Sequence, residues 1–194
     1  MLGCSPNVIE ENKAIQKIDS LDMNIFSKKG EKIYSLTSPN SIYNNIKLNY
    51  ESEKPIINIF NGEEIEYIIS SNESILSDNN KLLILKGNVE LKTVNQDEEF
   101  IYADNFVWNI EETNTYLLEG NIRFEDQNII LYSGKAKLGS DNIIEFFYPV
   151  KYIVKGENND NKYETTSENA YYNIETKSLS FKAIDKRVKS IIYF

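Results

Sequence analysis

The sequence predicts a single all-β domain, and three observations support this prediction. Apolar and polar residues alternate with a period of two along most of the chain from Leu21 onward, which is typical of strands with one dry face. One strand pattern occurs twice, as LILKGNVELK at residues 83–92 and as LLEGNIRFE at residues 117–125. The chain has 13 Tyr and 9 Phe but only 8 Gly and 4 Pro, a composition that favours strands joined by Asn-containing turns.

The composition excludes several kinds of function. The 194 residues suit one domain with a sizeable core. A net charge of −9 disfavours nucleic-acid binding, because such a surface repels phosphate backbones. The absence of His and the lone Cys exclude a Cys–His pair, a Ser–His–Asp triad, a nitrogen or sulfur metal cluster and an internal disulfide. Carboxylate chemistry and a calcium site pass this filter, but we assign no catalytic residue, metal or cofactor.

The repeated strands share an apolar face. A third copy is predicted at residues 143–155 and a weaker fourth at residues 178–183, so the unit is an antiparallel, hairpin-like element of about 30 residues whose apolar face packs on its neighbours. Gly87 and Gly120 occupy equivalent positions, where a missing side chain lets a strand bend or lets the facing layer approach. The inward face is either an ordinary core or one wall of a larger groove. The groove candidates are Leu83, Leu85, Val89, Leu91, Tyr116, Leu118, Ile122, Phe124, Ile144, Phe146 and Val150.

The N-terminus suggests an anchor. The residues Gly3–Cys4 resemble the end of a bacterial lipoprotein signal, whose cysteine becomes the lipidated N-terminus, although the basic and apolar regions of a signal peptide are absent. The alternative is an ordinary cytoplasmic start with an incidental Cys. We divide the chain into an anchor and polar tether at residues 1–20, with at most a short helix, and a β domain at residues 21–194. No apolar run is long enough for a transmembrane helix.

Taken together, these motifs resemble the LptC family. The resemblance rests on LKGNV at residues 85–89, its echo LEGNI at residues 118–122, SLTSP at residues 35–39 and the anchored start, and it extends from about Tyr34 to Phe181. The family resemblance implies an open β-jelly roll, a twisted antiparallel sheet folded into a V-shaped groove. It also implies a non-enzymatic carrier in lipopolysaccharide export, located in the periplasm and anchored to the inner membrane. The family usually has an N-terminal membrane helix, which a lipidated Cys4 would replace here.

The resemblance also implies partners. The carrier would accept lipopolysaccharide from the inner-membrane ABC transporter of the export machine and pass it to a periplasmic bridge protein of the same fold, similar to LptA. The apolar segment KSIIYF, Lys189–Phe194, could be the sheet edge that receives this protein by strand addition. It could equally pack back on its own sheet.

Two alternatives to the carrier stay open at this point. The chain could be a structural or self-assembling envelope lipoprotein that uses its C-terminal edge. It could also be a polysaccharide-active β-repeat enzyme with paired carboxylates, although acidic residues in turns and on wet faces are usually solvated. Candidate carboxylates for such an enzyme are Asp97, Glu98, Glu99, Asp104, Glu111 and Glu112.

Overall fold

The computed structural model describes residues 14–77, 79–94, 99–110, 115–147, 149–156, 158 and 160–193. In this part of the chain every regular element is a strand, all strands join one antiparallel sheet, and no helix could cross a membrane. The strands are β1 (Ile15–Phe26), β2 (Lys32–Asn44), β3 (Asn49–Glu53), β4 (Ile56–Asn61), β5 (Glu64–Ser70), β6 (Glu73–Ser77), β7 (Leu82–Thr93), β8 (Phe100–Asn109), β9 (Tyr116–Asp126), β10 (Ile129–Leu138), β11 (Ile143–Phe147), β12 (Val150–Lys155), β13 (Asn161–Ser167), β14 (Asn169–Asn173), β15 (Ser178–Lys182) and β16 (Lys189–Ile192).

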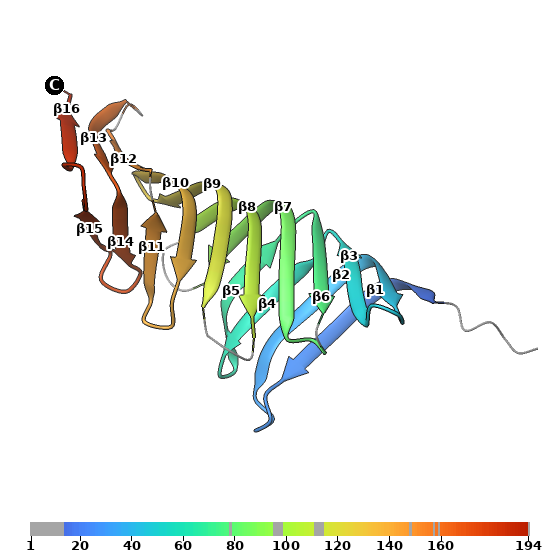
Figure 1. The fold of residues 1–194 in the computed structure, drawn as a ribbon. Helices are drawn as coiled ribbons and strands as arrows, with labels where there is room; N and C mark the ends of the chain where they lie inside the picture. The colour runs from blue at the N-terminus through green and yellow to red at the C-terminus, as the bar shows by residue number, and fades with distance from the viewer. Residues whose placement is uncertain are drawn as a thin grey trace, which may run out of the picture.

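The sheet folds into two layers because its long strands bend halfway. The first half of β7 pairs with β6 and its second half with β5. In the same way, β10 pairs with β12 through its first half and with β11 through its second. The first layer contains β3, β6, β11, β14 and β15, and the second contains β4, β5, β12, β13 and β16. The long strands β1, β2, β7, β8, β9 and β10 pass through both. Figure 1 shows this arrangement as a long row of strands from β1 to β16.

Each strand that changes layer does so at one line of positions, which we call the corner. In β7 the pairing with β8 shifts between Lys86 and Val89, so that Gly87 and Asn88 form a bulge with positive φ angles of 72° and 47°. Gly120 and Asn121 in β9 repeat this conformation, with φ of 77° and 45°. Glycine and asparagine tolerate this left-handed region better than other residues. The recurring Gly-Asn pair is therefore the signal for the bend.

Two strands that run the other way through the corner, β2 and β10, use serine. The Ser38 hydroxyl is a hydrogen-bond donor to two carbonyl oxygens, those of Asn40 and Glu53, and each lies 2.7 Å away. The Ser133 hydroxyl likewise reaches the carbonyl oxygens of Lys135 and Phe147, at 2.6 and 2.9 Å. A bend leaves backbone carbonyls without ladder partners, and these hydroxyls satisfy them inside a nearly dry environment. Ser71 and Ser167 make the equivalent single bond.

The core lies between the two layers. Aromatic rings from opposite layers meet there at centroid distances of 5.4 Å for Tyr34 and Trp108 and 4.6 Å for Phe124 and Tyr172. These buried rings remove large apolar areas from water and hold the layers together. The packing continues toward the C-terminal end, where Tyr152 meets Phe181 at 5.4 Å.

The predicted fold is confirmed: the protein is an all-β, open β-jelly roll built from repeated hairpin-like units. Two details differ from the sequence prediction. The third copy at residues 143–155 is not one strand but two, β11 and β12, which lie in different layers. Residues 15–19, expected in a tether, pair with β2 as part of β1, because β2 extends to Asn44 and offers them backbone hydrogen-bonding groups. The division into anchor and domain stays a prediction, because Cys4 lies outside the described residues.

The Gly-Asn bend gives a stability prediction. An alanine Cβ at Gly120 would lie 2.5 Å from Asp104 Oδ2, whereas one at Gly62, also at positive φ, would meet nothing within 4 Å. We expect Gly62→Ala to cost about 1 kcal/mol of unfolding free energy from backbone strain alone. Gly120→Ala should cost on the order of 1–3 kcal/mol more, because Asp104 must move. Urea denaturation measures both, and equal losses would contradict the steric account.

Candidate functional site

The predicted groove residues all face the space between the layers, and all are buried. Leu85, Leu118 and Phe146 are completely inaccessible to solvent, and Tyr116, the most exposed of the set, is only 7% exposed. In this conformation the space is filled by the side chains of the two layers, as in an ordinary core. Whether these residues also contact a lipid remains a prediction, and such contact requires the layers to separate.

The layers are covalently joined only at the corner. At the opposite ends of the strands, each turn connects two strands of the same layer: β4 to β5 in the second layer, β6 to β7 in the first and β9 to β10 in the second again. We call this side of the molecule the mouth. Because backbone hydrogen bonds run through the corner and not across the mouth, only side chains hold the mouth closed.

Four polar side chains meet across the mouth, and we call them the cross-layer cluster: Glu99, Asp126, Tyr172 and Lys177. Glu99 and Asp126 belong to the second layer and are 2% and 4% exposed. Tyr172 comes from β14 in the first layer; its hydroxyl lies 2.5 Å from Asp126 Oδ2 and 3.1 Å from Glu99 Oε1. Lys177, from the turn between β14 and β15, forms an ion pair with Glu99 Oε1. The cluster therefore ties the two layers together at the mouth.

The cluster is electrostatically costly to keep buried. Burial raises the pKa of the Glu99 carboxyl above its ordinary value, and the negative charge of Asp126 adds to this, while Lys177 and Tyr172 lower it. Burial, together with the hydrogen bond to Asp126 and the nearby charge of Glu99, also raises the pKa of Tyr172, which stays protonated as a donor. Glu99 Oε2 and Asp126 Oδ1 are buried without a hydrogen-bond partner among the described residues. Buried polar atoms without a partner raise the free energy of the closed arrangement.

The sequence interpretation missed this cluster. Glu99 was expected in a surface loop, but it is buried because the Thr93 hydroxyl accepts a hydrogen bond from the Glu99 amide at 3.2 Å and fixes the residue at the edge of β8. The alternation itself carried a signal. Glu99 lies two residues before inward-facing Ile101, and Asp126 two residues after inward-facing Phe124, so both carboxylates continue an apolar face.

Of the other candidate carboxylates, the structure describes only Asp104. Asp104 lies at the corner, where its Oδ2 accepts a hydrogen bond from Asn121 Nδ2 at 2.8 Å. Asp97, Glu98, Glu111 and Glu112 lie outside the described residues, as does Tyr148. Within the described ranges, no group of three or more His, Cys, Asp or Glu side chains is arranged to hold a metal ion.

Comparison with known proteins identifies the family of this chain. The family described as "Lipopolysaccharide-assembly, LptC-related" matches residues 5–116, more than half of the chain. The chain belongs to the LptC family. No curated protein sequence gives a significant match. Among solved structures, the chain is similar to LptH of Pseudomonas aeruginosa, the LptA homologous periplasmic component of the conserved lipopolysaccharide transport device. The identity is 7% and the TM-score 0.45, over 82% of this chain and 94% of that one.

Membership of the LptC family gives the chain its general role. The chain takes part in lipopolysaccharide assembly and transport. The family match covers the strands from β1 to the start of β9, including the first Gly-Asn bend. The predicted family and fold are thus confirmed, and the lipid path and the partners are left to be inferred from the site.

The cross-layer cluster gives a second prediction. Lys177→Met leaves Glu99 buried without its cation, and we expect the free energy of unfolding to fall by about 2 kcal/mol. Lys47→Met is the matched control, because Lys47 and Glu51 form a pair 3.9 Å apart in which both side chains are exposed. Its loss should stay below about 0.5 kcal/mol. Equal effects of the two substitutions in urea denaturation would show that the cluster does not hold the layers.

The same cluster predicts a pH dependence. Because the folded-state pKa of Glu99 is raised, the folded protein binds this proton more tightly than the unfolded chain. Its contribution to stability is therefore lost as the pH rises from the ordinary carboxyl range, near 4.5, through the raised value. Glu99→Gln should lack this fall, which denaturation of both proteins between about pH 5 and about pH 7 measures. A parallel fall in the variant would assign the dependence to other groups.

Proposed function

We propose that the chain is a non-enzymatic lipid carrier that accepts lipopolysaccharide from an inner-membrane ABC transporter and passes it along a periplasmic bridge. In this proposal the acyl chains lie between the two layers and the sugars stay in solvent. The observation that carries it is a repeated apolar face on two layers that are joined at the corner and held only by side chains at the mouth. A negatively charged protein also has little reason to hold the anionic sugars directly.

The energetics of lipid transfer favour this arrangement. One twelve-carbon chain exposed to water costs on the order of 10 kcal/mol, at about 0.8 kcal/mol per methylene. Acyl chains that enter between the layers replace contacts such as that of Phe124 with Phe146, whose rings lie 5.7 Å apart. The exchange of one apolar contact for another changes the free energy little, and apolar contacts have no fixed direction, so the lipid can slide.

Opening at the mouth breaks the cross-layer cluster. When the layers separate, water or lipid headgroup oxygens reach the buried carboxylates of Glu99 and Asp126, which compensates for the lost bonds of Tyr172 and Lys177. Two further buried donors, the Tyr34 hydroxyl and Trp108 Nε1, have no partner among the described residues. Ester or amide carbonyls of a bound lipid would supply acceptors for both. These features support a closed resting state that a lipid opens.

Two sheet edges are suited to partners. β1 pairs only with β2, and β16 pairs only with β13, so each presents an unpaired side. The residues of β16 are all exposed, including Ile191 and Ile192. An apolar edge of this kind favours strand addition by another protein. We propose that the Lys189–Phe194 segment receives the periplasmic bridge protein and that the N-terminal edge contacts the transporter. Phe194 itself lies outside the described residues.

Photo-crosslinking tests the carrier. A crosslinker at Leu85, Leu118 or Phe146, all directed between the layers, should capture lipopolysaccharide in cells whose export machine is active. Matched controls are the next outward positions on the same strands, Lys86, Glu119 and Glu145, which should capture none. A crosslinker at Ile191 should instead capture a protein of the export bridge.

The possible outcomes separate the candidate functions. Capture of lipopolysaccharide at the outward positions as strongly as at the inward ones would overturn the groove. Capture of a second copy of this chain at Ile191, with no lipid at any inward position, would favour a self-assembling envelope lipoprotein.

We further propose that lipidated Cys4 anchors the protein to the inner membrane, since Gly3–Cys4 resembles a lipoprotein processing site. Mass spectrometry of the N-terminal peptide from native membranes should find acylated Cys4 without residues 1–3. A peptide that retains unmodified Met1 would refute the anchor.

A further inference from the structure

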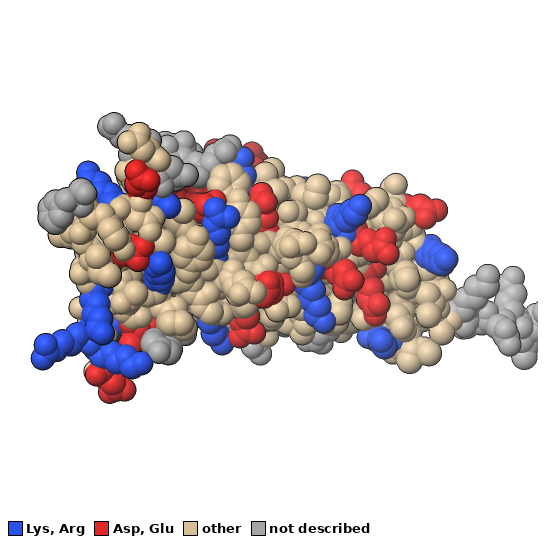
Figure 2. Space-filling model, turned by 90° about the horizontal axis from the view of Figure 1, so that it is seen from above, with Lys and Arg blue, Asp and Glu red and all other residues tan. Residues whose placement is uncertain are grey.

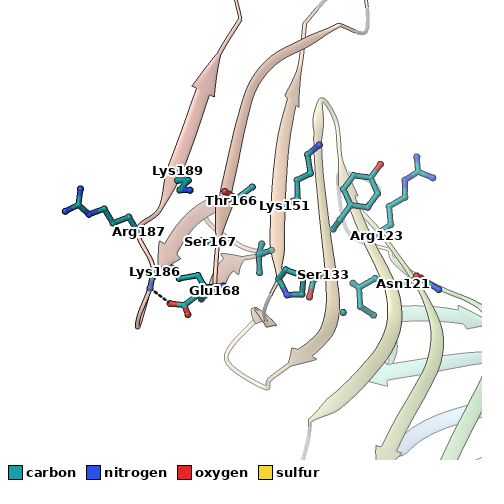
Figure 3. A pocket seen from close by; sticks show the side chains of 15 residues that line it. Asn121, Arg123, Ser133, Lys151, Thr166, Ser167, Glu168, Lys186, Arg187 and Lys189 are labelled. Atoms are coloured by element: carbon teal, nitrogen blue, oxygen red, sulfur yellow. Dashed lines mark hydrogen bonds between the residues drawn. The ribbon is translucent and has the colours of Figure 1, made fainter.

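A large hollow lies on the outer surface of the second layer, beside the corner. Its volume is about 980 Å³, and it crosses β9, β10, β12 and β13. Arg123, Tyr132, Lys151 and Thr166 are register neighbours on these four strands, and their exposed side chains point away from the core. Figure 3 shows Arg123 at one side of the hollow and Arg187 at the other, with Lys151, Thr166 and Ser167 between them. This volume is at the upper end of the range of small-molecule sites.

The lining of the hollow is basic, although the protein as a whole is acidic. The chain carries −9, yet five cations line this one hollow, including both of its arginines: Arg123, Lys151, Lys186, Arg187 and Lys189. Figure 2 shows blue side chains gathered at the C-terminal end, at left, whereas blue and red mix along the rest of that face. Two of the cations have acidic neighbours outside the hollow, since Arg123 pairs with Glu125, and Lys151 with Glu164 at 3.3 Å.

The one carboxylate in the lining serves to build the hollow. Glu168 Oε2 accepts hydrogen bonds from three consecutive backbone amides, of Ile184, of Asp185 at 2.9 Å and of Lys186 at 3.3 Å. These bonds, and the charge of Lys186, lower the pKa of Glu168. They fix the segment between β15 and β16 against the corner, and this segment presents Lys186 and Arg187. Glu168 therefore positions the cations more than it neutralises them.

The rest of the lining mixes apolar and uncharged polar residues, and the four strands that the hollow crosses offer no free backbone. The ring of Tyr132, 39% exposed, and Pro149 lie in the lining, together with the buried groove candidates Ile122 and Val150. Each strand beneath the hollow is paired on both sides, as β10 is with β9 and β12, so an acidic peptide cannot add a strand here. Recognition must come from side-chain cations and apolar contact together, which suits a small anionic amphiphile.

We propose that this hollow binds the phosphate group of an anionic lipid headgroup. The phosphate oxygens pair with Lys151, Lys189 and Arg187, because lysine and arginine are the usual phosphate partners. The glycerol or sugar next to the phosphate lies against Tyr132 and Pro149. The exposed side chains of the site point away from the space between the layers, so its binding of phosphate does not depend on the proposed lipid carriage.

Binding to short-chain lipids tests the chemistry with the full chain. Dihexanoyl-phosphatidylglycerol, below its micelle concentration, should shift the backbone amide resonances of Tyr132, Lys151 and Arg187 in a saturable way. Dihexanoyl-phosphatidylcholine, whose phosphate is neutralised by choline, should shift them at least about tenfold more weakly. If inorganic phosphate displaces phosphatidylglycerol in a saturable way, the phosphate alone is recognised. If it does not, the whole headgroup is recognised. Either result supports the site.

Charge-matched variants locate the binding. Arg187→Gln with Lys189→Gln should weaken phosphatidylglycerol binding about tenfold, since each basic residue near an anionic lipid contributes about 1 kcal/mol or less. Lys28→Gln with Lys29→Gln removes the same charge from the exposed turn between β1 and β2 and should leave binding unchanged. Equal losses in both variants, equal binding of the two lipids, or tighter binding of an acidic peptide than of either lipid would overturn the proposal.

Discussion

The strand ladder must pass through a sharp bend without leaving backbone groups unpaired, and the rest of this structure depends on how it does so. At Gly87 and Gly120 a two-residue bulge in the left-handed region turns the chain, and at Ser38 and Ser133 a side-chain hydroxyl replaces the carbonyl partners that the bend removes. The two devices alternate along the sheet because neighbouring strands are antiparallel and enter the corner from opposite layers. These four layer crossings therefore use backbone conformation or a hydroxyl, and the apolar side chains remain free to face inward.

A corner of this kind leaves the opposite side of the molecule structurally weak. Turns at the mouth never cross between layers, so the layers are held there by packing and by the cross-layer cluster. The cluster combines buried carboxylates with one lysine and one tyrosine. Their hydrogen bonds and ion pair hold the closed layers together, and water could replace these interactions if the layers separated. In the proposed carrier, a closed core and a lipid path would be two states of the same inward face, which would reconcile complete burial of Leu118 with a carrier role.

Charged side chains are unevenly distributed between the interior, the mouth and the outer surface of the protein. The interior contains few charged groups, and these lie at the mouth, where solvent is near. The acidic excess is spread over the surface, whereas both arginines gather on the outer wall near the C-terminal end. Fields of this type act over about a Debye length, roughly 8–10 Å in physiological salt, so the basic hollow is electrostatically distinct from the rest of the surface. One molecule thus presents an apolar interior and a basic hollow on its outer surface.

The sequence by itself determined the fold class, the repeat and the inward face, because period-two alternation and the Gly-Asn pair are local signals that do not depend on distant residues. It also indicated the family. Only the tertiary structure decided that residues 143–155 divide between two layers, since the division depends on where β10 ends its pairing with each neighbour. The same holds for Glu99 and Lys177, which are 78 residues apart in the chain and meet only because two layers close on each other. Polar contacts between distant strands leave no mark in local periodicity, and the charged lining of the hollow is likewise assembled from separate strands.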